Sequence, residues 1–228
     1  IKRKVWARNL KKIDLNKLKG RKCYGGLDLS SSDDFSAFVL VFPMDDDSFI
    51  VLPYFWIPKE RLKKRRKDGI TGPETLRAWV KSGVLTATPG EVVDYNFILH
   101  KIDELMKLYR VEEIAFDRWG AAKLRSDMQE KGWNIVEFGQ GFYSMSSPMK
   151  EMERLLLEGK LNHPGNPVLD WMADNVVATQ DAAGGLKPEK AKSGEKIDGI
   201  VATIMALARA IGWKNKQKGY NGADVKVF

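Results

Sequence analysis

The stretch Cys-Tyr-Gly-Gly-Leu-Asp-Leu-Ser at residues 23–30 decides the fold that this sequence predicts. It is a short apolar run that ends at Asp28 before a serine-rich turn, a pattern typical of a strand over residues 22–29. Two more strands are expected over residues 35–43 and 49–57, and the turn between them contains consecutive aspartates. Because these strands follow one another through short turns, the beginning of the chain predicts an antiparallel meander.

Helical patterns dominate the rest of the chain. Apolar spacing and helix-boundary residues predict helices over residues 73–81, 95–108, 120–131, 145–158, 166–177 and 198–212. Two apolar runs at 113–116 and 133–138 predict a fourth and a fifth strand, and 179–187 predicts an edge strand or an irregular segment. This order favours an α/β fold with a central mixed sheet, ordered 3-2-1-4-5 and flanked by helices on both faces. Such an arrangement is the ribonuclease H-like architecture.

Three aspartates stand where predicted elements end or begin. Asp28 lies on the first strand, Asp117 follows the fourth, and Asp198 opens the last helix. The first and fourth strands are neighbours in the expected order, so these carboxylates would come together. Carboxylates at close range repel one another unless a cation lies between them, and hard oxygen ligands suit Mg²⁺ or Mn²⁺. We therefore expect these residues to be catalytic and to hold two metal ions that clamp a scissile phosphate.

Each of these aspartates also has a purely structural interpretation. Asp28 could hydrogen-bond within the turn that follows it, and Asp117 could pair with the adjacent Arg118. Asp198 could be the N-cap of the helix that it opens, because aspartate is a preferred residue at that position. These alternatives stay open for any single residue, whereas all three aspartates in this order favour a metal site.

The charge of the chain points to an anionic partner. Its 38 basic and 30 acidic residues give a formal net charge of +8, which favours nucleic acid. A basic loop immediately precedes Asp198, and we expect four of its lysines to contact the DNA backbone independently of base sequence: Lys187, Lys190, Lys192 and Lys196.

Other classes of protein are disfavoured. Cys23 is the only cysteine, so the sequence has neither an internal disulfide nor a cysteine-based zinc site, and any metal must be held mainly by carboxylates. No apolar run approaches the roughly 18 residues of a membrane span. The basic start does not resemble a signal peptide. We therefore expect a protein that is neither secreted nor inserted in a membrane.

Four motifs resemble the nuclease domain of the large terminase subunit of tailed bacteriophages. They are Gly-Leu-Asp-Leu-Ser-Ser at 26–31 with Asp-Phe-Ser-Ala at 34–37, Phe-Asp-Arg-Trp-Gly at 116–120, the stretch 162–175, and Lys-Ile-Asp-Gly-Ile-Val-Ala at 196–202. The resemblance implies a ribonuclease H-like endonuclease that uses two divalent cations to cut concatemeric double-stranded viral DNA during packaging. The family's three metal-binding acids fall on Asp28, Asp117 and Asp198.

The resemblance also implies partners and a domain organisation. The partners would be double-stranded DNA, a small terminase subunit and the procapsid portal, in the cytoplasm of the host. The family places an ATPase motor ahead of the nuclease, and the sequence has no Gly-x-x-x-x-Gly-Lys-Ser/Thr loop. We therefore expect a monomeric fragment with an interdomain linker remnant at 1–21, a nuclease domain at 22–213 and a flexible tail at 214–228.

Two other functions remain as alternatives. The same fold serves transposases, integrases and junction resolvases, so fold alone does not separate these enzymes from a packaging nuclease. A module that docks DNA and portal, and is silent in isolation, is the alternative outside enzymes.

Overall fold

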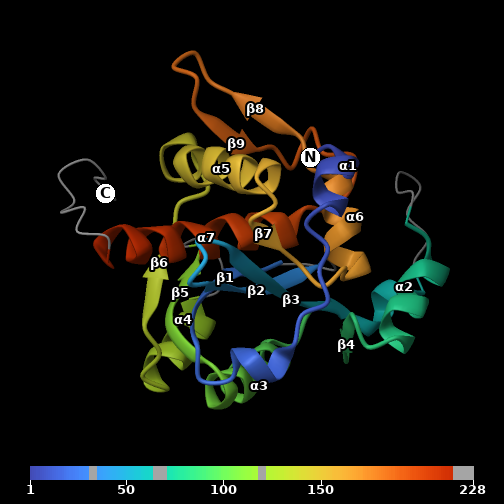
Figure 1. The fold of residues 1–228 in the computed structure, drawn as a ribbon. Coiled ribbons are helices and arrows are strands. Elements are labelled where there is room, and N and C mark those ends of the chain that lie inside the picture. The colour runs from blue at the N-terminus through green and yellow to red at the C-terminus, as the bar shows by residue number, and fades with distance from the viewer. Residues whose placement is uncertain (31–34, 64–70, 118–121, 218–228) are drawn as a thin grey trace.

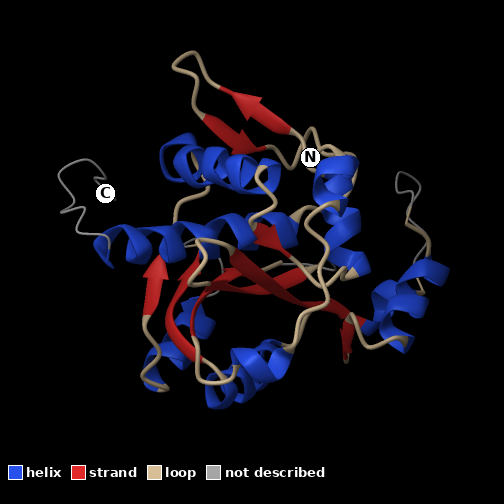
Figure 2. Ribbon diagram, viewed as in Figure 1, coloured by secondary structure: helices blue, strands red, loops and turns tan. Residues whose placement is uncertain are grey.

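The computed structural model describes residues 1–30, 35–63, 71–117 and 122–217, and a mixed β-sheet lies at its centre (Figures 1 and 2). Within these residues the strands follow the order β4-β3-β2-β1-β5-β6, and β7 pairs with β3 outside this path. The bounds are β1 (Lys22–Asp28), β2 (Ser36–Pro43), β3 (Phe49–Pro58), β4 (Thr86–Thr88), β5 (Arg110–Phe116), β6 (Ile135–Glu137) and β7 (Leu161–Asn162). A separate antiparallel hairpin consists of β8 (Ala178–Gln180) and β9 (Leu186–Pro188).

Helices cover both faces of the sheet. They are α1 (Arg3–Ala7), α2 (Pro73–Lys81), α3 (Tyr95–Leu108), α4 (Ala122–Glu130), α5 (Phe142–Leu157), α6 (Pro167–Asn175) and α7 (Asp198–Gln217), with short 3₁₀ turns at Leu15–Leu18 and Lys59–Leu62. The long helix α7 runs across one face, and α5 packs on its outer side, whereas α3 and α4 lie on the opposite face (Figure 1). The three-layer arrangement expected from the sequence is confirmed.

The sequence of β2 explains why the sheet must be covered twice. Every residue of this strand is buried. Val39 and Val41 join the core beneath α7, whereas Phe38 and Leu40 join the core beneath α3. Successive side chains of a strand point to opposite faces, so a mainly apolar strand that is buried at every position is stable only between two layers.

The pairing of β1 with β5 sets the position of two candidate residues. These strands are parallel, and Leu27 pairs with Phe116. Asp28 and Asp117 are the next residues along the two chains, so both lie at the same edge of the sheet. The expected neighbour relation of the first and fourth predicted strands is therefore confirmed.

Helix α7 lies directly on the backbone of β1 at Gly26. A Cβ atom on Gly26 would stand 2.0 Å from the carbonyl oxygen of Ala202 and 2.9 Å from the amide nitrogen of Ala206. Asp28 lies two residues beyond Gly26 on the strand, and Asp198 lies four residues before Ala202 on the helix. The two residues from Gly26 to Asp28 and the four residues from Ala202 to Asp198 each span about 6 Å. The contact between Gly26 and Ala202 therefore brings the two aspartates close together.

The first residues of the chain pack against elements near its other end. The Trp6 ring stacks on His163 with 4.2 Å between ring centroids, and its Nε1 donates a 2.7 Å hydrogen bond to Asp170. Buried Asn9 donates to the carbonyl oxygen of Leu156, and its side-chain oxygen accepts from the amide of Leu161. Burial lowers the pKa of His163, which favours a neutral packing residue.

The structure differs from the predicted elements mainly in short segments. Strands β4 and β7 were not predicted, because two or three residues are too few to show a strand period. The segment 179–187 contributes to a separate hairpin, β8–β9, rather than to the edge of the central sheet. Residues 59–67 form a lysine- and arginine-rich stretch, of which Lys59–Leu62 form a 3₁₀ turn, and residues 64–70 lie outside the described part of the chain.

We predict that Gly26→Ala strongly destabilises the protein. The added methyl group would meet the backbone of α7 rather than a movable side chain, so the helix must shift away from the strand. The expected loss in the free energy of unfolding is about 3 kcal/mol or more, measured by denaturant titration.

Gly212→Ala in the same helix is the matched control. A Cβ at Gly212 would meet no atom within 4 Å. In a helix interior, alanine is also more favourable than glycine by about 0.8–1 kcal/mol. This variant should therefore be as stable as the wild type or slightly more stable. Equal stability of the two alanine variants would contradict the close contact at Gly26.

Candidate functional site

Asp28 and Asp198 lie together at the edge of the sheet where β1 ends and α7 begins. Both are almost fully buried, at 3% and 7% exposure. They come from positions 170 residues apart in the sequence. Burying two carboxylates side by side is unfavourable unless a positive charge compensates them.

The compensating charge is the ammonium group of Lys190. Its Nζ lies 2.8 Å from Asp28 Oδ2 and 2.9 Å from Asp198 Oδ1. Gln140 Nε2 donates a 3.1 Å hydrogen bond to the other oxygen of Asp28. Asp198 Oδ2 is buried and has no hydrogen-bond partner among the described residues. The carboxylate pair thus holds one cation and keeps an unused oxygen.

The burial of Asp28 changes its acidity. Burial is the main cause that raises the pKa of Asp28, the charge of Lys190 lowers this pKa, and the charge of Asp198 raises it. The net result is a pKa of about 6. Burial alone would favour the neutral amine of Lys190, but the two carboxylates raise its pKa above the ordinary value. The site is therefore an ammonium held between acidic groups at neutral pH.

Asp117 lies one residue beyond β5, at the edge that Asp28 also occupies. Among the residues that the structure describes, no group of three or more acidic, histidine or cysteine side chains is gathered closely enough to hold a metal. Of the three predicted aspartates, the structure therefore brings Asp28 and Asp198 onto one ammonium and leaves Asp117 beside them at the neighbouring strand end.

The segment expected as a basic loop begins in β9 and continues as a hydrogen-bonded turn. The amide of Glu189 donates to Val177, and the amides of Lys192 and Ser193 both donate to the carbonyl oxygen of Glu189. The turn follows β9 and presents Lys190 to the acids.

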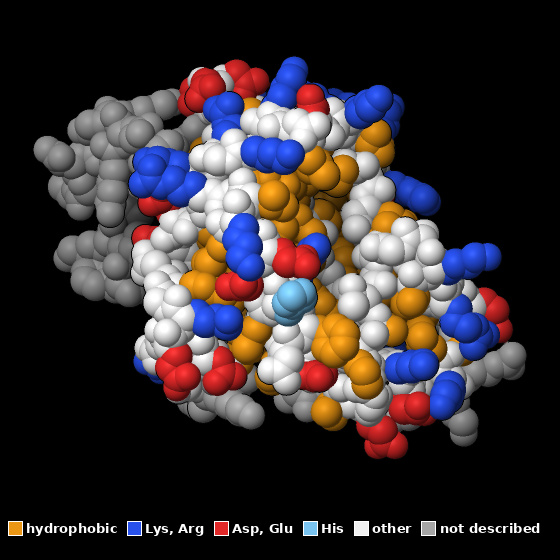
Figure 3. Space-filling model, turned by 90° about the horizontal axis from the view of Figure 1, so that it is seen from below, with side chains coloured by type: hydrophobic (Ala, Val, Ile, Leu, Met, Phe, Trp, Pro, Cys, Tyr) orange, Lys and Arg blue, Asp and Glu red, His pale blue; other side chains and the backbone are white. Residues whose placement is uncertain are grey.

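The other predicted lysines lie around this turn. Lys187 forms a 3.4 Å ion pair with Glu189 and lies over the ring of Phe142. Lys192 is exposed, and its Nζ donates to Thr179 Oγ1 at 3.3 Å. Lys196 is half-buried two residues before Asp198. Figure 3 shows the molecule from below Figure 1, on the side of α3 rather than of the β8–β9 hairpin, and there basic and acidic side chains are interspersed with hydrophobic ones.

Sequence reasoning missed Gln140 as a member of the site and expected Lys190 at its rim. Gln140 follows β6, which is parallel to β5, so it reaches the edge at which the other parallel strands end. Side chains that follow parallel strands gather at the carboxyl edge of a sheet, and this rule could have identified Gln140. No local signal in the sequence distinguishes Lys190 from the lysines beside it.

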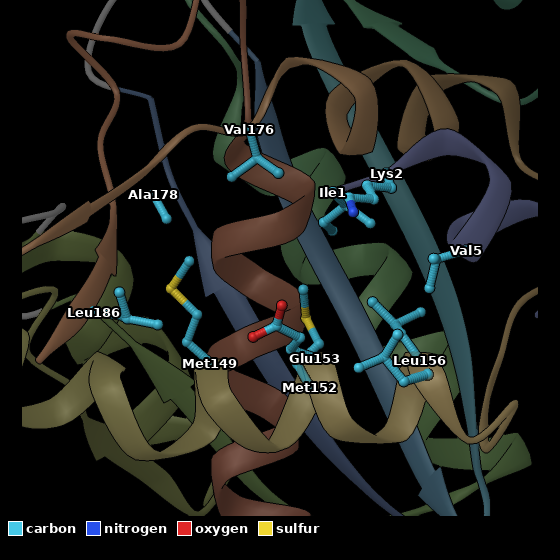
Figure 4. Close-up of a pocket in the computed structure, with 11 residues that line it drawn as sticks. Ile1, Lys2, Val5, Met149, Met152, Glu153, Leu156, Val176, Ala178 and Leu186 are labelled. Carbon is cyan, nitrogen blue, oxygen red and sulfur yellow. The ribbon is translucent and has the colours of Figure 1, made fainter. Parts of the chain in front are cut away.

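A separate apolar pocket lies between α5, the first residues of the chain and the β8–β9 hairpin (Figure 4). Its volume is about 420 Å³, and its lining includes Val5, Met149, Met152 and Leu186. None of the three candidate aspartates lines it, and Glu153 is the one acidic residue among the described residues that line it. This pocket lacks the ligands for metal chemistry, so the carboxylate site is the stronger candidate.

Solved structures define the class of this domain. The crystal structure of the large terminase of bacteriophage HK97 matches with a TM-score of 0.82 and 37% identity, over 92% of this chain and 43% of that chain. The large terminase nuclease of thermophilic phage G20c, solved with bound magnesium, matches with a TM-score of 0.56 and 10% identity, over 90% of this chain and 96% of that chain. The domain thus has the ribonuclease H-like fold of terminase nucleases.

Sequence comparisons give the family. The model of the terminase large subunit endonuclease domain matches residues 1–213. The large terminase subunit of Enterobacteria phage HK97 is 39% identical over 201 residues, covering 87% of this chain and 39% of that protein. Protein YmfN of Escherichia coli K12 is 34% identical over 209 residues, covering 88% of this chain and 46% of that protein. This chain belongs to the terminase large subunit endonuclease domain family, and it spans less than half of either relative.

We predict a pH-dependent contribution of Asp28 to stability in the absence of metal. The pKa of Asp28 is 3.8 as a free group and about 6 in the folded protein. Between these two pH values Asp28 is protonated in the folded state and ionised in the unfolded state. The free energy of unfolding should therefore decrease as pH rises through this window, by on the order of 1–3 kcal/mol. Asp28→Asn should lose this decrease, measured by denaturant titration in EDTA from pH 4 to 7.

Asp45→Asn is the control, because the Asp45 side chain is 93% exposed. Its profile should follow that of the wild type. If Asp28→Asn and Asp45→Asn had the same pH profile, the ionisation of Asp28 would not be coupled to folding.

Proposed function

We propose that this domain is a divalent-metal-dependent endonuclease that cuts concatemeric double-stranded viral DNA during genome packaging. The observation that carries the proposal is the buried pair Asp28 and Asp198, which already holds a cation and retains an unbound oxygen. Membership in the terminase endonuclease family supports the same reaction.

The residues at the site fit a hard divalent cation. Asp28 and Asp198 would supply carboxylate oxygens, joined by Asp117 from the neighbouring strand end, and such oxygens are the ligands that Mg²⁺ and Mn²⁺ prefer. Asp28 would be held firmly as a ligand, because the central strand β1 fixes its position and the hydrogen bond from Gln140 restrains its side chain. The magnesium bound in the G20c nuclease supports this choice of metal.

The bound ions would supply an activated water and stabilise the charge on the leaving oxygen. The residues of the chain have different tasks. The buried carboxylates fix the position of positive charge at the sheet edge, and Gln140 restrains the rotation of Asp28. Lys187, Lys192 and Lys196 supply positive charge on the side of the β8–β9 hairpin, where a phosphate backbone can approach.

The biological setting of this reaction is also a proposal. The family is that of terminase large subunit endonuclease domains, and one relative is the large terminase subunit of phage HK97. We therefore infer double-stranded DNA as the substrate, with a small terminase subunit and the procapsid portal as partners in the host cytoplasm. No helix among the described residues has the length and apolar character needed to cross a membrane.

We predict that the domain nicks and linearises plasmid DNA with Mn²⁺ or Mg²⁺ and not with EDTA. Asp28→Asn, Asp117→Asn and Asp198→Asn should each reduce the rate by about 100-fold or more, because asparagine keeps the shape and removes the ligand charge. Agarose gel analysis of supercoiled plasmid over time measures the rate.

Asp45→Asn, at an exposed position, is the control and should cut at the wild-type rate. Wild-type cleavage by Asp28→Asn would refute the metal assignment. A folded wild-type domain that binds Mn²⁺ but cuts under no condition would instead favour a docking module.

We further predict that the double substitution Lys187→Glu with Lys192→Glu weakens DNA binding equally for all sequences. Each lysine that neutralises a phosphate contributes about 0.9 to the slope of log K against log salt, so this slope should decrease in magnitude by about 2. Fluorescence anisotropy with duplexes of unrelated sequence, in EDTA, measures both quantities.

The double substitution Lys101→Glu with Lys107→Glu is the matched charge reversal, because both lysines lie on α3 at the opposite face of the sheet. It should leave the salt slope unchanged. If both variants changed the slope equally, a general charge effect would explain the result better than a contact surface at the hairpin.

A further inference from the structure

We propose that Lys190 is an internal competitor for the metal, whose ammonium group occupies the cation position between Asp28 and Asp198 until a divalent ion displaces it. This inference rests on the proposed metal site and adds a residue that controls access to it. Lys190 is not a ligand in this proposal, because an ammonium group has no free lone pair to offer a metal.

The contacts of Lys190 are those of an occupant of the site. One nitrogen atom lies within 3 Å of an oxygen from each carboxylate, at 2.8 Å and 2.9 Å. A divalent cation that used the same two oxygens would need the same space, and it would repel the ammonium at short range. The lysine and the metal therefore exclude each other.

The attachment of Lys190 allows it to leave the site without unfolding its segment. The turn that carries it is held by backbone hydrogen bonds from Glu189 to Val177 and from Ser193 to Glu189. The Lys190 side chain itself is 49% exposed, although its tip contacts two buried acids. A flexible four-carbon stem on an anchored turn can move its ammonium outward while the backbone stays in place.

The anchored turn also makes the competition effective. A tethered cation is present at high effective concentration next to the carboxylates, so it occupies them without any dissolved salt. A monovalent ion would gain little by replacing it, whereas a divalent ion adds one positive charge to a site with two negative charges. Lys190 would thus reduce the affinity for every metal and favour divalent over monovalent ions.

A purely structural ion pair would behave in the opposite way. If Lys190 only held the two acids in position, its removal would let the carboxylates separate and would weaken metal binding. If Lys190 occupies the metal position, its removal frees the oxygens and strengthens binding. The sign of the change in metal affinity distinguishes the two roles.

The first experiment measures Mn²⁺ binding by isothermal titration calorimetry without DNA. Lys190→Gln should bind Mn²⁺ about tenfold more tightly than the wild type, because the competing charge is gone. Lys192→Gln is the matched control, because it lies in the same turn and its ammonium contacts Thr179. It should bind Mn²⁺ like the wild type. Unchanged or weaker binding by folded Lys190→Gln would overturn the proposal.

A second experiment uses the wild-type chain and avoids any loss of folding in a variant. Acetylation of lysine amines by a small reagent is followed by peptide mass spectrometry, in EDTA and in Mn²⁺. Mn²⁺ should increase the labelling rate of Lys190 several-fold and leave Lys192 unchanged. An equal or lower rate at Lys190 in Mn²⁺ would overturn the proposal.

The two measurements also separate this inference from the proposed function. Equal Mn²⁺ binding by wild type and Lys190→Gln would leave the metal site intact and refute only the competition. Binding that appears only in Lys190→Gln would support the competition. Absence of Mn²⁺ binding in both proteins would refute the metal site, and the competition with it.

Discussion

The contact between Gly26 and the backbone of Ala202 is the constraint on which the rest of the structure depends. It allows α7 to lie directly on the central strand, and it fixes how far the helix can slide along that strand. Asp28 lies about 6 Å from this contact along the strand, and Asp198 lies about 6 Å from it along the helix. The two aspartates meet because both lie on the same side of the contact. A larger residue at position 26 would change the spacing of the carboxylates as well as the packing of the core.

The electrostatics of the site follow from this close packing. The helix and the sheet exclude water from both aspartates, so the chain must provide positive charge nearby. Lys190 provides it from a turn that is rigid in its backbone and exposed along its side chain. The unused oxygen of Asp198 shows that one ammonium does not satisfy the pair completely. A buried acidic site with incomplete compensation is suited to exchanging its cation.

Much of this arrangement could be predicted from the sequence, because it depends on strand ends and helix starts. The meander, the parallel strand that ends before Asp117 and the helix that opens at Asp198 each have a local apolar pattern. The inward position of Lys190 could not be predicted, because several lysines occupy the same basic segment. Strands β4 and β7 were missed because their pairing with β3 depends on tertiary contacts rather than on their own residues.

The packing of α1 has a consequence for the order in which the chain can fold. Trp6 contacts His163 and Asp170, which follow it by 157 and 164 residues, and Asn9 reaches Leu156 across 147 residues. On a ribosome, the first helix emerges long before any of these partners exists. Helix α1 can reach its final position only after most of the domain that follows it has been made, so its attachment is a late step in the folding of this domain.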